Sequence, residues 1–318
     1  MSEVIRLLKK FGGISLLEQY IRTGVFPTAV AELILLGKRR TALEILRLTI
    51  QHKIRQKLER KYKKYLDEFD KKFDNSLRHV SSNKVWICWL QGIENAPLLV
   101  KSCFESVKKN LINKEIIIVT RENYKDFVEI PDYIIEKWEK GIITNTHFTD
   151  LLRLELLIKH GGVWIDSTVL CSCPEDEIPN YFFDSELFFY QSLKPGRDGK
   201  SIYISSWYIN AKTNNKILMA TRMLCYIYWE KNNRMIDYFL LHHFFSIVLD
   251  RYNEEWSKIM PRDNSAPHLL LLRLFDSYDE IMWNSIKAQT PFHKLSYKFT
   301  QDETNKTDTY YKKIIEKY

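Results

Sequence analysis

The stretch from residue 144 to residue 173, TNTHFTDLLRLELLIKHGGVWIDSTVLCSC, constrains the possible folds of this chain more than any other. Its first half predicts a helix, because Asp150, Arg153 and Leu157 recur at three- and four-residue spacing and would share one helical face. Glycines follow at 161 and 162, where the C-terminus of a helix needs a residue that tolerates a positive φ angle. We therefore expect a helix that ends in a tight turn.

The second half of this stretch predicts a buried strand that ends on a carboxylate. Residues 163–165, VWI, form a short apolar run, and Asp166 follows directly. Taken alone, Asp166 is explained equally well by a structural role, as a turn cap or the partner of a Lys, and by a functional one. Asp150 and Arg153, however, can return to the same strand end, the place where open α/β sheets bind ligands. Together they would form a pocket for a ligand with hydroxyl and phosphate groups, because Arg binds anions in a bidentate manner and carboxylates accept from hydroxyls.

These residues carry a resemblance to a known family. The string FTDLLRLELLIKHGGVWIDSTV resembles the core motif of the capsular polysaccharide synthesis glycosyltransferases, which are related to the retaining DXD-type sugar transferases and to clostridial toxin-like glucosyltransferase domains. That wider group has an (S/T)-D-x-x-R helix before a G-G-x-(W/Y)-(I/L)-D-x-D strand end. Five residues match the pattern at the same spacing: Asp150, Arg153, Gly161, Gly162 and Asp166. Thr168 replaces the second Asp of the DXD, so the second carboxylate metal ligand is missing.

The resemblance covers residues 86 to 298 and implies a fold and an activity. The implied fold is α/β, a Rossmann-like GT-A glycosyltransferase fold. The implied enzyme is a retaining hexosyltransferase that moves galactose or glucose from a UDP-sugar to a polyprenyl-diphosphate-linked capsular or surface polysaccharide intermediate. Two alternatives stay open: a catalytically weak module that binds nucleotide sugars or glycans, and a membrane scaffold of a polysaccharide synthesis complex.

The resemblance also implies roles for the residues of the central motif. Asp150, Arg153 and Asp166 would be catalytic and would bind the donor sugar nucleotide. The implied cofactor is Mn²⁺ or Mg²⁺, with Asp166, Thr168 and His293 as its protein ligands.

A βαβ unit is predicted before the central motif. Residues 83–92, NKVWICWLQG, and 115–120, EIIIVT, are apolar runs typical of buried parallel strands, and residues 98–111 predict a helix between them. Trp89 lies at the end of the first strand. From the residues alone Trp89 is a core side chain, whereas the resemblance implies that its ring packs against the uracil of the donor.

A polar run near the C-terminus, residues 290–298, TPFHKLSYK, holds residue types that can stabilise a departing diphosphate. Taken alone, it is typical of an edge strand with solvated lysines. The resemblance implies that a loop here closes over the diphosphate, with these residues as donor-binding groups: Lys294, Ser296, Tyr297 and Lys298. The only Gly-rich polar run, residues 194–200, KPGRDGK, lacks the spacing of a Walker loop and is interpreted as a surface loop near the pocket.

Two further residues are assigned to the acceptor side. A helix is predicted from Asp237 through His242 and His243 to Leu249. Adjacent residues on a helix point about 100° apart, so the two histidines cannot bind one metal ion, and core packing is the preferred interpretation of the pair. By its position in the family, this helix implies that Asp237 and His242 line the acceptor cleft.

The charge of the chain is concentrated in its first quarter. Residues 1–80 hold 18 Lys and Arg against 9 Asp and Glu, whereas the whole chain carries +8, so residues 81–318 sum to −1. We therefore divide the chain into a basic helical appendage, residues 1–80, and a GT-A-like catalytic domain, residues 81–318. The basic character concerns the appendage and its partner rather than the active site.

Three interpretations of the appendage stay open. Its longest predicted helix, from residue 41 onward, has an apolar stripe with basic residues on its other faces. The helix would be a solvated element packed on the main domain, a docking element for an anionic membrane surface, or a contact for homo-oligomers. We expect no nucleic-acid partner, because no aromatic platform or recognised motif accompanies the basic run.

The location of the protein follows from what the sequence lacks. The first ten residues are charged and predict no signal peptide, and no apolar run has the length of a bilayer span. The five cysteines are odd in number and lie mostly in apolar runs, which favours reduced core thiols. We expect a cytoplasmic protein that is peripheral at the inner face of the cell membrane.

Overall fold

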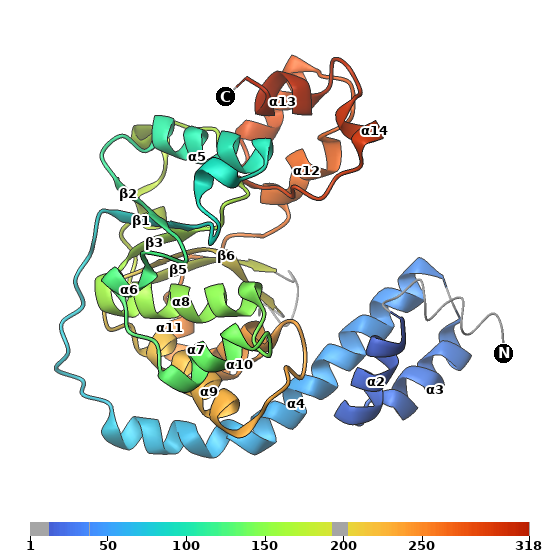
Figure 1. The fold of residues 1–318 in the computed structure, drawn as a ribbon, viewed down its shortest axis with the longest axis vertical. Coiled ribbons are helices and arrows are strands. Elements are labelled where there is room, and N and C mark those ends of the chain that lie inside the picture. The colour runs from blue at the N-terminus through green and yellow to red at the C-terminus, as the bar shows by residue number, and fades with distance from the viewer. Residues whose placement is uncertain (1–12, 38, 193–202, 318) are drawn as a thin grey trace.

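The computed structural model describes residues 13–37, 39–192 and 203–317 (Figure 1). The expectations for the first ten residues and for the polar run at 194–200 therefore lie outside the described residues. The centre of the molecule is a five-stranded mixed sheet of order β2-β1-β3-β6-β5. Its strands are β1 (Lys84–Cys88), β2 (Glu115–Val119), β3 (Gly162–Ile165), β5 (Leu187–Ser192) and β6 (Tyr203–Ala211).

The first three strands in this order are parallel, which confirms the predicted βαβ unit. β1 pairs in parallel with β2 and with β3, and α5 (Leu98–Asn110) connects β1 to β2. β6 runs antiparallel to β3, and β5 runs antiparallel to β6. The fold is thus α/β with a parallel half and an antiparallel half. The expected Rossmann-like arrangement applies to the parallel half.

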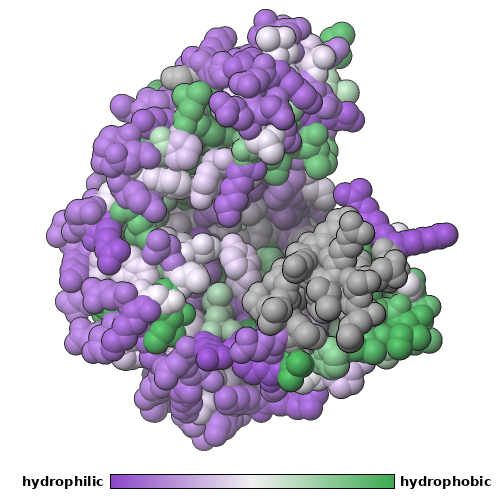
Figure 2. All heavy atoms as spheres, turned by 45° about the vertical axis from the view of Figure 1, so that its right-hand side comes forward, coloured by the Kyte–Doolittle hydropathy of each residue, from purple (hydrophilic) through white to green (hydrophobic). Residues whose placement is uncertain are grey.

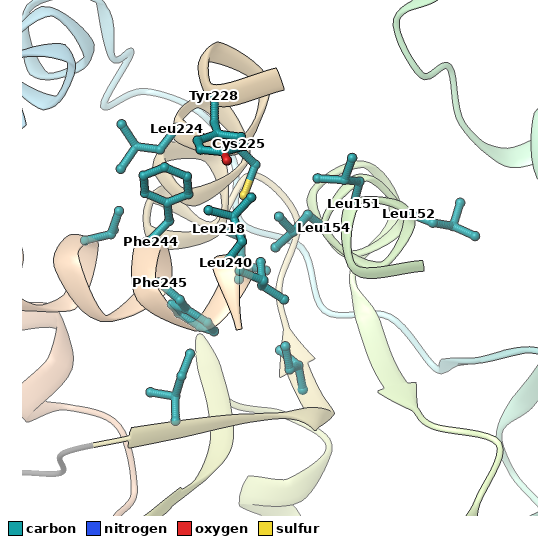
Figure 3. Close-up of a cluster of buried hydrophobic side chains, with 14 of the residues drawn as sticks. Leu151, Leu152, Leu154, Leu218, Leu224, Cys225, Tyr228, Leu240, Phe244 and Phe245 are labelled. Atoms are coloured by element: carbon teal, nitrogen blue, oxygen red, sulfur yellow. The ribbon is translucent and has the colours of Figure 1, made fainter. Parts of the chain in front are cut away.

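Helices cover both faces of the sheet, so its strands are apolar on both sides. Trp86 and Trp164 point to the face beneath α8 (Asn145–His160), whereas Val85 and Val163 belong to the core on the other face. α9 (Lys216–Lys231) and α10 (Leu240–Arg251) complete the first side. In Figure 3, Leu154 of α8 points toward Leu218 of α9, while Leu152 lies on the opposite side of α8.

The N-terminal helices form an arm that reaches away from the sheet in Figure 1. The arm consists of α2 (Gly13–Thr23), α3 (Phe26–Leu36) and the first half of α4 (Arg40–Lys72). The second half of α4 instead packs on α9 and α10. Tyr62 is fully buried there, with its ring 5.1 Å from that of Phe244 and 6.0 Å from that of Tyr228. The division of the chain at residue 80 stays a prediction, but α4 already shares the core of the body.

A small lobe lies on the other side of the sheet, beside α5 (Figure 1). It contains a two-stranded antiparallel sheet of β4 (Val169–Cys171) and β7 (Phe292–Lys294), so the strand predicted within residues 290–298 is confirmed. The C-terminal helices pack around a third apolar core there. They are α12 (Leu269–Arg273), α13 (Glu280–Lys287), α14 (Gln301–Thr304) and the π-helix η5 (Tyr311–Ile315).

Shorter elements complete the chain. They are α6 (Tyr124–Phe127), α7 (Asp132–Glu139), α11 (Asn253–Ser257), and the 3-10 turns η1 (Ile93–Asn95), η2 (Glu175–Glu177), η3 (Asn180–Phe182) and η4 (Ala266–His268). Within the described ranges, every helix is too short or too polar to cross a bilayer. All five cysteines are free, and four of them are buried.

Candidate active site

The strand β3 delivers Asp166 to the edge of the sheet. Side chains alternate along a strand, so Trp164 and Asp166 point to the same face, the one covered by α8. Trp164 Nε1 donates a hydrogen bond of 2.9 Å to Asp166 Oδ1. Gly162 has a φ angle of 91°, and a Cβ atom there would lie 2.3 Å from the carbonyl oxygen of Lys84. The glycine therefore allows β3 to lie close enough to β1 for Asp166 to take this position.

The helix α8 supplies the second part of the site. Thr144 caps its start by accepting a hydrogen bond from the backbone N–H of His147. His147, Asp150 and Arg153 follow at three-residue intervals and form a polar stripe on one side of the helix. The predicted C-terminus is confirmed, because Gly161 ends α8 with a φ angle of 66°.

Arg153 joins the helix to the strand end. Its guanidinium lies 3.3 Å from Asp150 Oδ1 and 3.2 Å from Asp166 Oδ1, and it donates 2.7 Å to the carbonyl oxygen of Ser206 in β6. Arg153 and Asp150 are only 4% and 6% exposed, whereas the side chain of Asp166 is 25% exposed. The predicted convergence of these three side chains is thus present, and Asp166 is the member that solvent reaches.

Lys294 of β7 is the fourth member of this cluster. Its Nζ donates 2.8 Å to Asp166 Oδ2 and 2.7 Å to Thr168 Oγ1. Burial opposes ionisation of Asp166, but the charges of Lys294 and Arg153 outweigh it and hold the pKa of this carboxyl below its ordinary value. Asp166 is therefore a carboxylate at neutral pH, held by two cations.

Two residues behind the cluster, His147 and Trp229, hold Asp150 in place. The sequence interpretation missed both. Trp229 Nε1 donates 2.8 Å to His147 Nε2, and His147 Nδ1 lies 3.2 Å from Asp150 Oδ2. Because an indole N–H can only donate, Nε2 is the acceptor and the His147 proton is on Nδ1, facing Asp150. The i, i+3 spacing of His147 and Asp150 was a signal for this pair. Trp229 comes from α9 and carries no such signal.

The acceptor-side residues lie on the α10 side of the cluster. His242 Nε2 is 3.2 Å from Ser206 Oγ. Ser206 is also the residue whose carbonyl oxygen accepts a hydrogen bond from Arg153. Burial lowers the pKa of His242 to about 4, so the ring is neutral. Asp237 instead accepts from the backbone N–H of Phe239 and lies 3.5 Å from His243 Nε2, which is a structural arrangement at the start of the helix.

Tyr238 is a third residue that the sequence interpretation missed. Its side chain is exposed, yet the pKa of its hydroxyl is raised by desolvation and by the negative charges of Asp150 and Asp166. The hydroxyl is therefore close enough to the carboxylate cluster for its charges to oppose ionisation of Tyr238. Its neighbour in sequence, Asp237, was the residue that the pattern indicated.

Among the predicted donor-binding residues, Trp89 and Tyr297 form one pair, and Ser296 and Lys298 form another. Trp89 packs edge-on against Tyr297, with ring centres 5.5 Å apart, and its buried Nε1 has no hydrogen-bond partner among the described residues. Ser296 Oγ accepts from the backbone N–H of Lys298, whose side chain is exposed. In the part of the chain that the structure describes, no hydrogen bond or ion pair joins Ser296 or Lys298 to Asp166.

The profile of the family described as "Capsular polysaccharide synthesis protein" matches residues 40–314, which is most of the chain. The chain belongs to this family. Its match begins at α4 and includes all four members of the polar cluster, whereas α2 and α3 lie outside it.

One similar solved structure is entitled "PaToxG Glycosyltransferase". It is 14% identical, covers 85% of this chain and 96% of its own, and superposes with a TM-score of 0.38. At that score the likeness carries no argument about mechanism. No curated protein matches the chain.

The capsular family resemblance implied a divalent metal, and the residues here fit one poorly. Lys294 occupies the oxygens of both Asp166 and Thr168 that would face an ion. His293 does not join them: strand alternation turns it away from Lys294, and it is buried with Nε2 2.8 Å from Ser172 Oγ and its ring beside Trp283. Throughout the described ranges, no three His, Cys, Asp or Glu side chains are grouped as metal ligands.

Proposed function

We propose that this capsular polysaccharide synthesis protein is a glycosyltransferase that moves a hexose, galactose or glucose, from a UDP-sugar to a polyprenyl-diphosphate-linked glycan. The single observation that carries the proposal is the cluster of Asp150, Arg153, Asp166 and Lys294 at the end of β3. Two carboxylates and two cations in one partly open site suit a ligand with both hydroxyl and phosphate groups. The mixed sheet, with its parallel half before Asp166, is compatible with the GT-A fold that we propose for this enzyme.

Each part of the donor has a matching group. Asp150 and Arg153 would bind the hexose hydroxyls, and Arg153 Nε, which is buried without a partner in the described structure, is a donor available to a ligand. Trp89 would stack on the uracil, and its unpaired Nε1 would bond to the ligand. The diphosphate would lie against Lys294, with Ser296, Tyr297 and Lys298 from the loop after β7.

The reaction that fits this set is a same-face displacement with retention of configuration. The bond between the anomeric carbon and the diphosphate oxygen breaks while the acceptor oxygen forms its bond to the same carbon. The acceptor proton passes to the departing diphosphate oxygen, so no protein base and no protein nucleophile are needed. The protein contributes positive charge at the diphosphate and positions the sugar by hydrogen bonds.

The experiment that tests this function is a donor panel. The full-length protein is incubated with UDP-glucose, UDP-galactose and, as a control, a guanosine-linked hexose, and free nucleoside diphosphate is measured. We expect slow release of UDP from at least one uridine donor and none from the control. A protein that is stabilised against heat by UDP but releases none from any donor would be the binding module instead, and one that neither binds nor hydrolyses would contradict the proposal.

We also propose that the arm docks the enzyme on the inner face of the membrane, where a polyprenyl-linked acceptor would lie. Ile34 and Leu35 of α3 are 77% and 79% exposed, and Arg39 and Arg40 beside them are exposed cations. Figure 2 shows hydrophobic side chains gathered at the edge of the molecule on the side of the arm. Apolar residues flanked by Arg suit an anionic bilayer, because lipid tails accept the first and headgroups attract the second. Self-association through the same surface is the competing outcome.

A further inference from the structure

The ammonium of Lys294 lies between the first and third residues of the triplet Asp166–Ser167–Thr168. In a DXD sequence, two carboxylates at these positions carry two negative charges, which a divalent cation balances. Here the third residue is a neutral hydroxyl, so the triplet carries a single negative charge. One ammonium balances that charge, and the pair needs no further cation.

The oxygen atoms of Asp166 are already engaged. Oδ1 accepts from Trp164 Nε1 at 2.9 Å and lies 3.2 Å from Arg153, while Oδ2 accepts from Lys294 at 2.8 Å. A metal ion bound to Asp166 would compete with Lys294 for Oδ2 and would stand within a few ångströms of two cations. Since a divalent ion near an ammonium and a guanidinium is repelled by both, this site disfavours it.

The backbone holds Lys294 firmly in this position. Val169 of β4 pairs with Lys294 of β7, and the N–H of Leu295 donates 2.8 Å to the carbonyl oxygen of Thr168. Leu295 and Thr168 are 3% and 7% exposed, so this connection is inside the small lobe. The β4–β7 pairing therefore fixes the backbone of Lys294 beside Thr168, within reach of Asp166.

The ammonium itself stays accessible. The side chain of Lys294 is 21% exposed, and of its three N–H donors two are used by Asp166 and Thr168. For the described residues, no protein partner is recorded for the third donor. Since an ammonium of this kind is a compact charge that binds phosphate oxygens well, the third donor is available for an anionic ligand.

We infer that Lys294 is the resident cation of this site: it binds the diphosphate of the sugar nucleotide directly, and donor binding and cleavage proceed without a divalent metal. This inference rests on the proposed transferase function and deepens it. As the bond between the anomeric carbon and the diphosphate breaks, Lys294 keeps its proton and neutralises the charge on the leaving oxygens. Asp166 and Thr168 act by positioning the ammonium.

The first test measures the effect of metal on the wild-type full-length protein. UDP binding by titration calorimetry, and UDP release from the best donor, are compared in excess EDTA and in manganese. We expect both quantities to agree within about twofold between the two conditions, because the positive charge is supplied by the chain. Loss of binding and turnover in EDTA with full recovery in manganese would overturn the inference and leave the transferase proposal standing. Absence of UDP binding in both conditions would instead contradict the proposed function.

The second test exchanges the cation. Lys294→Gln is expected to weaken UDP binding at least about tenfold in EDTA, since one charged partner of the phosphate is removed. Lys258→Gln, a change of the same type at the exposed Lys that follows α11, is the control and should bind UDP like the wild type. The double variant Lys294→Ala with Thr168→Asp restores two carboxylates and should bind UDP only with manganese.

Two controls show whether a loss of binding comes from a failure to fold. Thermal unfolding and circular dichroism show whether each variant is native, and Lys294→Arg keeps the charge where Lys294→Gln is unstable. A merely structural Lys294 would change the melting temperature but not the affinity of the folded protein for UDP. A folded Lys294→Gln protein with wild-type affinity in EDTA, or a double variant indifferent to manganese, would contradict the inference.

Discussion

The arm and the active site differ in opposite ways from what proteins usually bury: the arm exposes apolar side chains, and the site buries charged ones. The arm exposes Ile34 and Leu35, side chains that soluble proteins usually cover. The site buries Asp150, Arg153 and His147, which proteins usually leave in water unless they are paired. Each departure costs free energy, so each points to a surface with a role other than stability.

The difference between them concerns how the cost is offset. In the site, every buried charge of the cluster has a partner of opposite charge within 3.3 Å, and Arg153 Nε is a donor without a partner among the described residues. In the arm, α3 packs on α4 by one face and leaves the other without any cover in the described structure. In our proposal the ligand site is complete within one chain, whereas the arm acts through a membrane surface.

The largest expected effect comes from the site. Asp166→Asn keeps the shape and an acceptor for Trp164 but removes the charge that positions Lys294 and Arg153. We expect UDP release from the donor to fall by about 10³-fold, the range seen when a preorganised electrostatic group is lost. The measurement is steady-state turnover, with Asp176→Asn, at an exposed position in η2, as the control. Turnover within tenfold of wild type would remove Asp166 from the mechanism.

The next prediction tests where along α4 the arm ends and the body of the protein begins. Tyr62→Ala should lower the free energy of unfolding by about 3–5 kcal/mol, because it empties a buried aromatic site between α9 and α10. Leu35→Ala, in the arm, should change it by less than about 0.5 kcal/mol. Urea unfolding measures both. Equal effects of the two changes would mean that α4 is no more part of the body than α3 is.

The third prediction concerns buried histidines and pH. Burial lowers the pKa of His242 to about 4 and that of His293 to about 3, so both are neutral in the fold but protonate near their ordinary pKa when unfolded. Stability is then complete above pH 6.5 and falls as the pH drops toward 4, by about 3 kcal/mol for His242. Urea unfolding at pH 7, 5.5 and 4 measures this loss. His242→Gln should make the curve shallower, and an unchanged curve would contradict the assignment.

The smallest effect is expected in the arm. The double change Ile34→Asp and Leu35→Asp should weaken binding to vesicles that contain anionic lipid by at least about tenfold, since burying one such side chain contributes about 1.5 kcal/mol or more. Sedimentation with the vesicles measures it, and donor hydrolysis should stay unchanged. Leu272→Asp, in α12 of the small lobe and 75% exposed, is the control. Loss of a dimer instead of vesicle binding would assign the surface to self-association.

Much of the fold was predictable because it is local. The apolar runs at β1, β2 and β3, the spacing along α8 and the glycines after it identified the parallel half of the sheet and the position of Asp166. His293 shows the limit of such reasoning. It lies next to Lys294 in the sequence and was assigned to a metal, yet strand alternation turns it into the core beside Trp283.

The amino-acid sequence by itself determined which helix, turn and strand carry Asp150, Arg153 and Asp166, because periodicity and glycine positions act over a few residues. Only the tertiary structure decided that Lys294, 128 residues away, reaches Asp166 and that Trp229 orients His147 behind Asp150. Those contacts depend on the pairing of β4 with β7 and on the packing of α9 against α8. Long-range pairing of this kind leaves no periodic signal along the chain, since either partner alone is compatible with many positions.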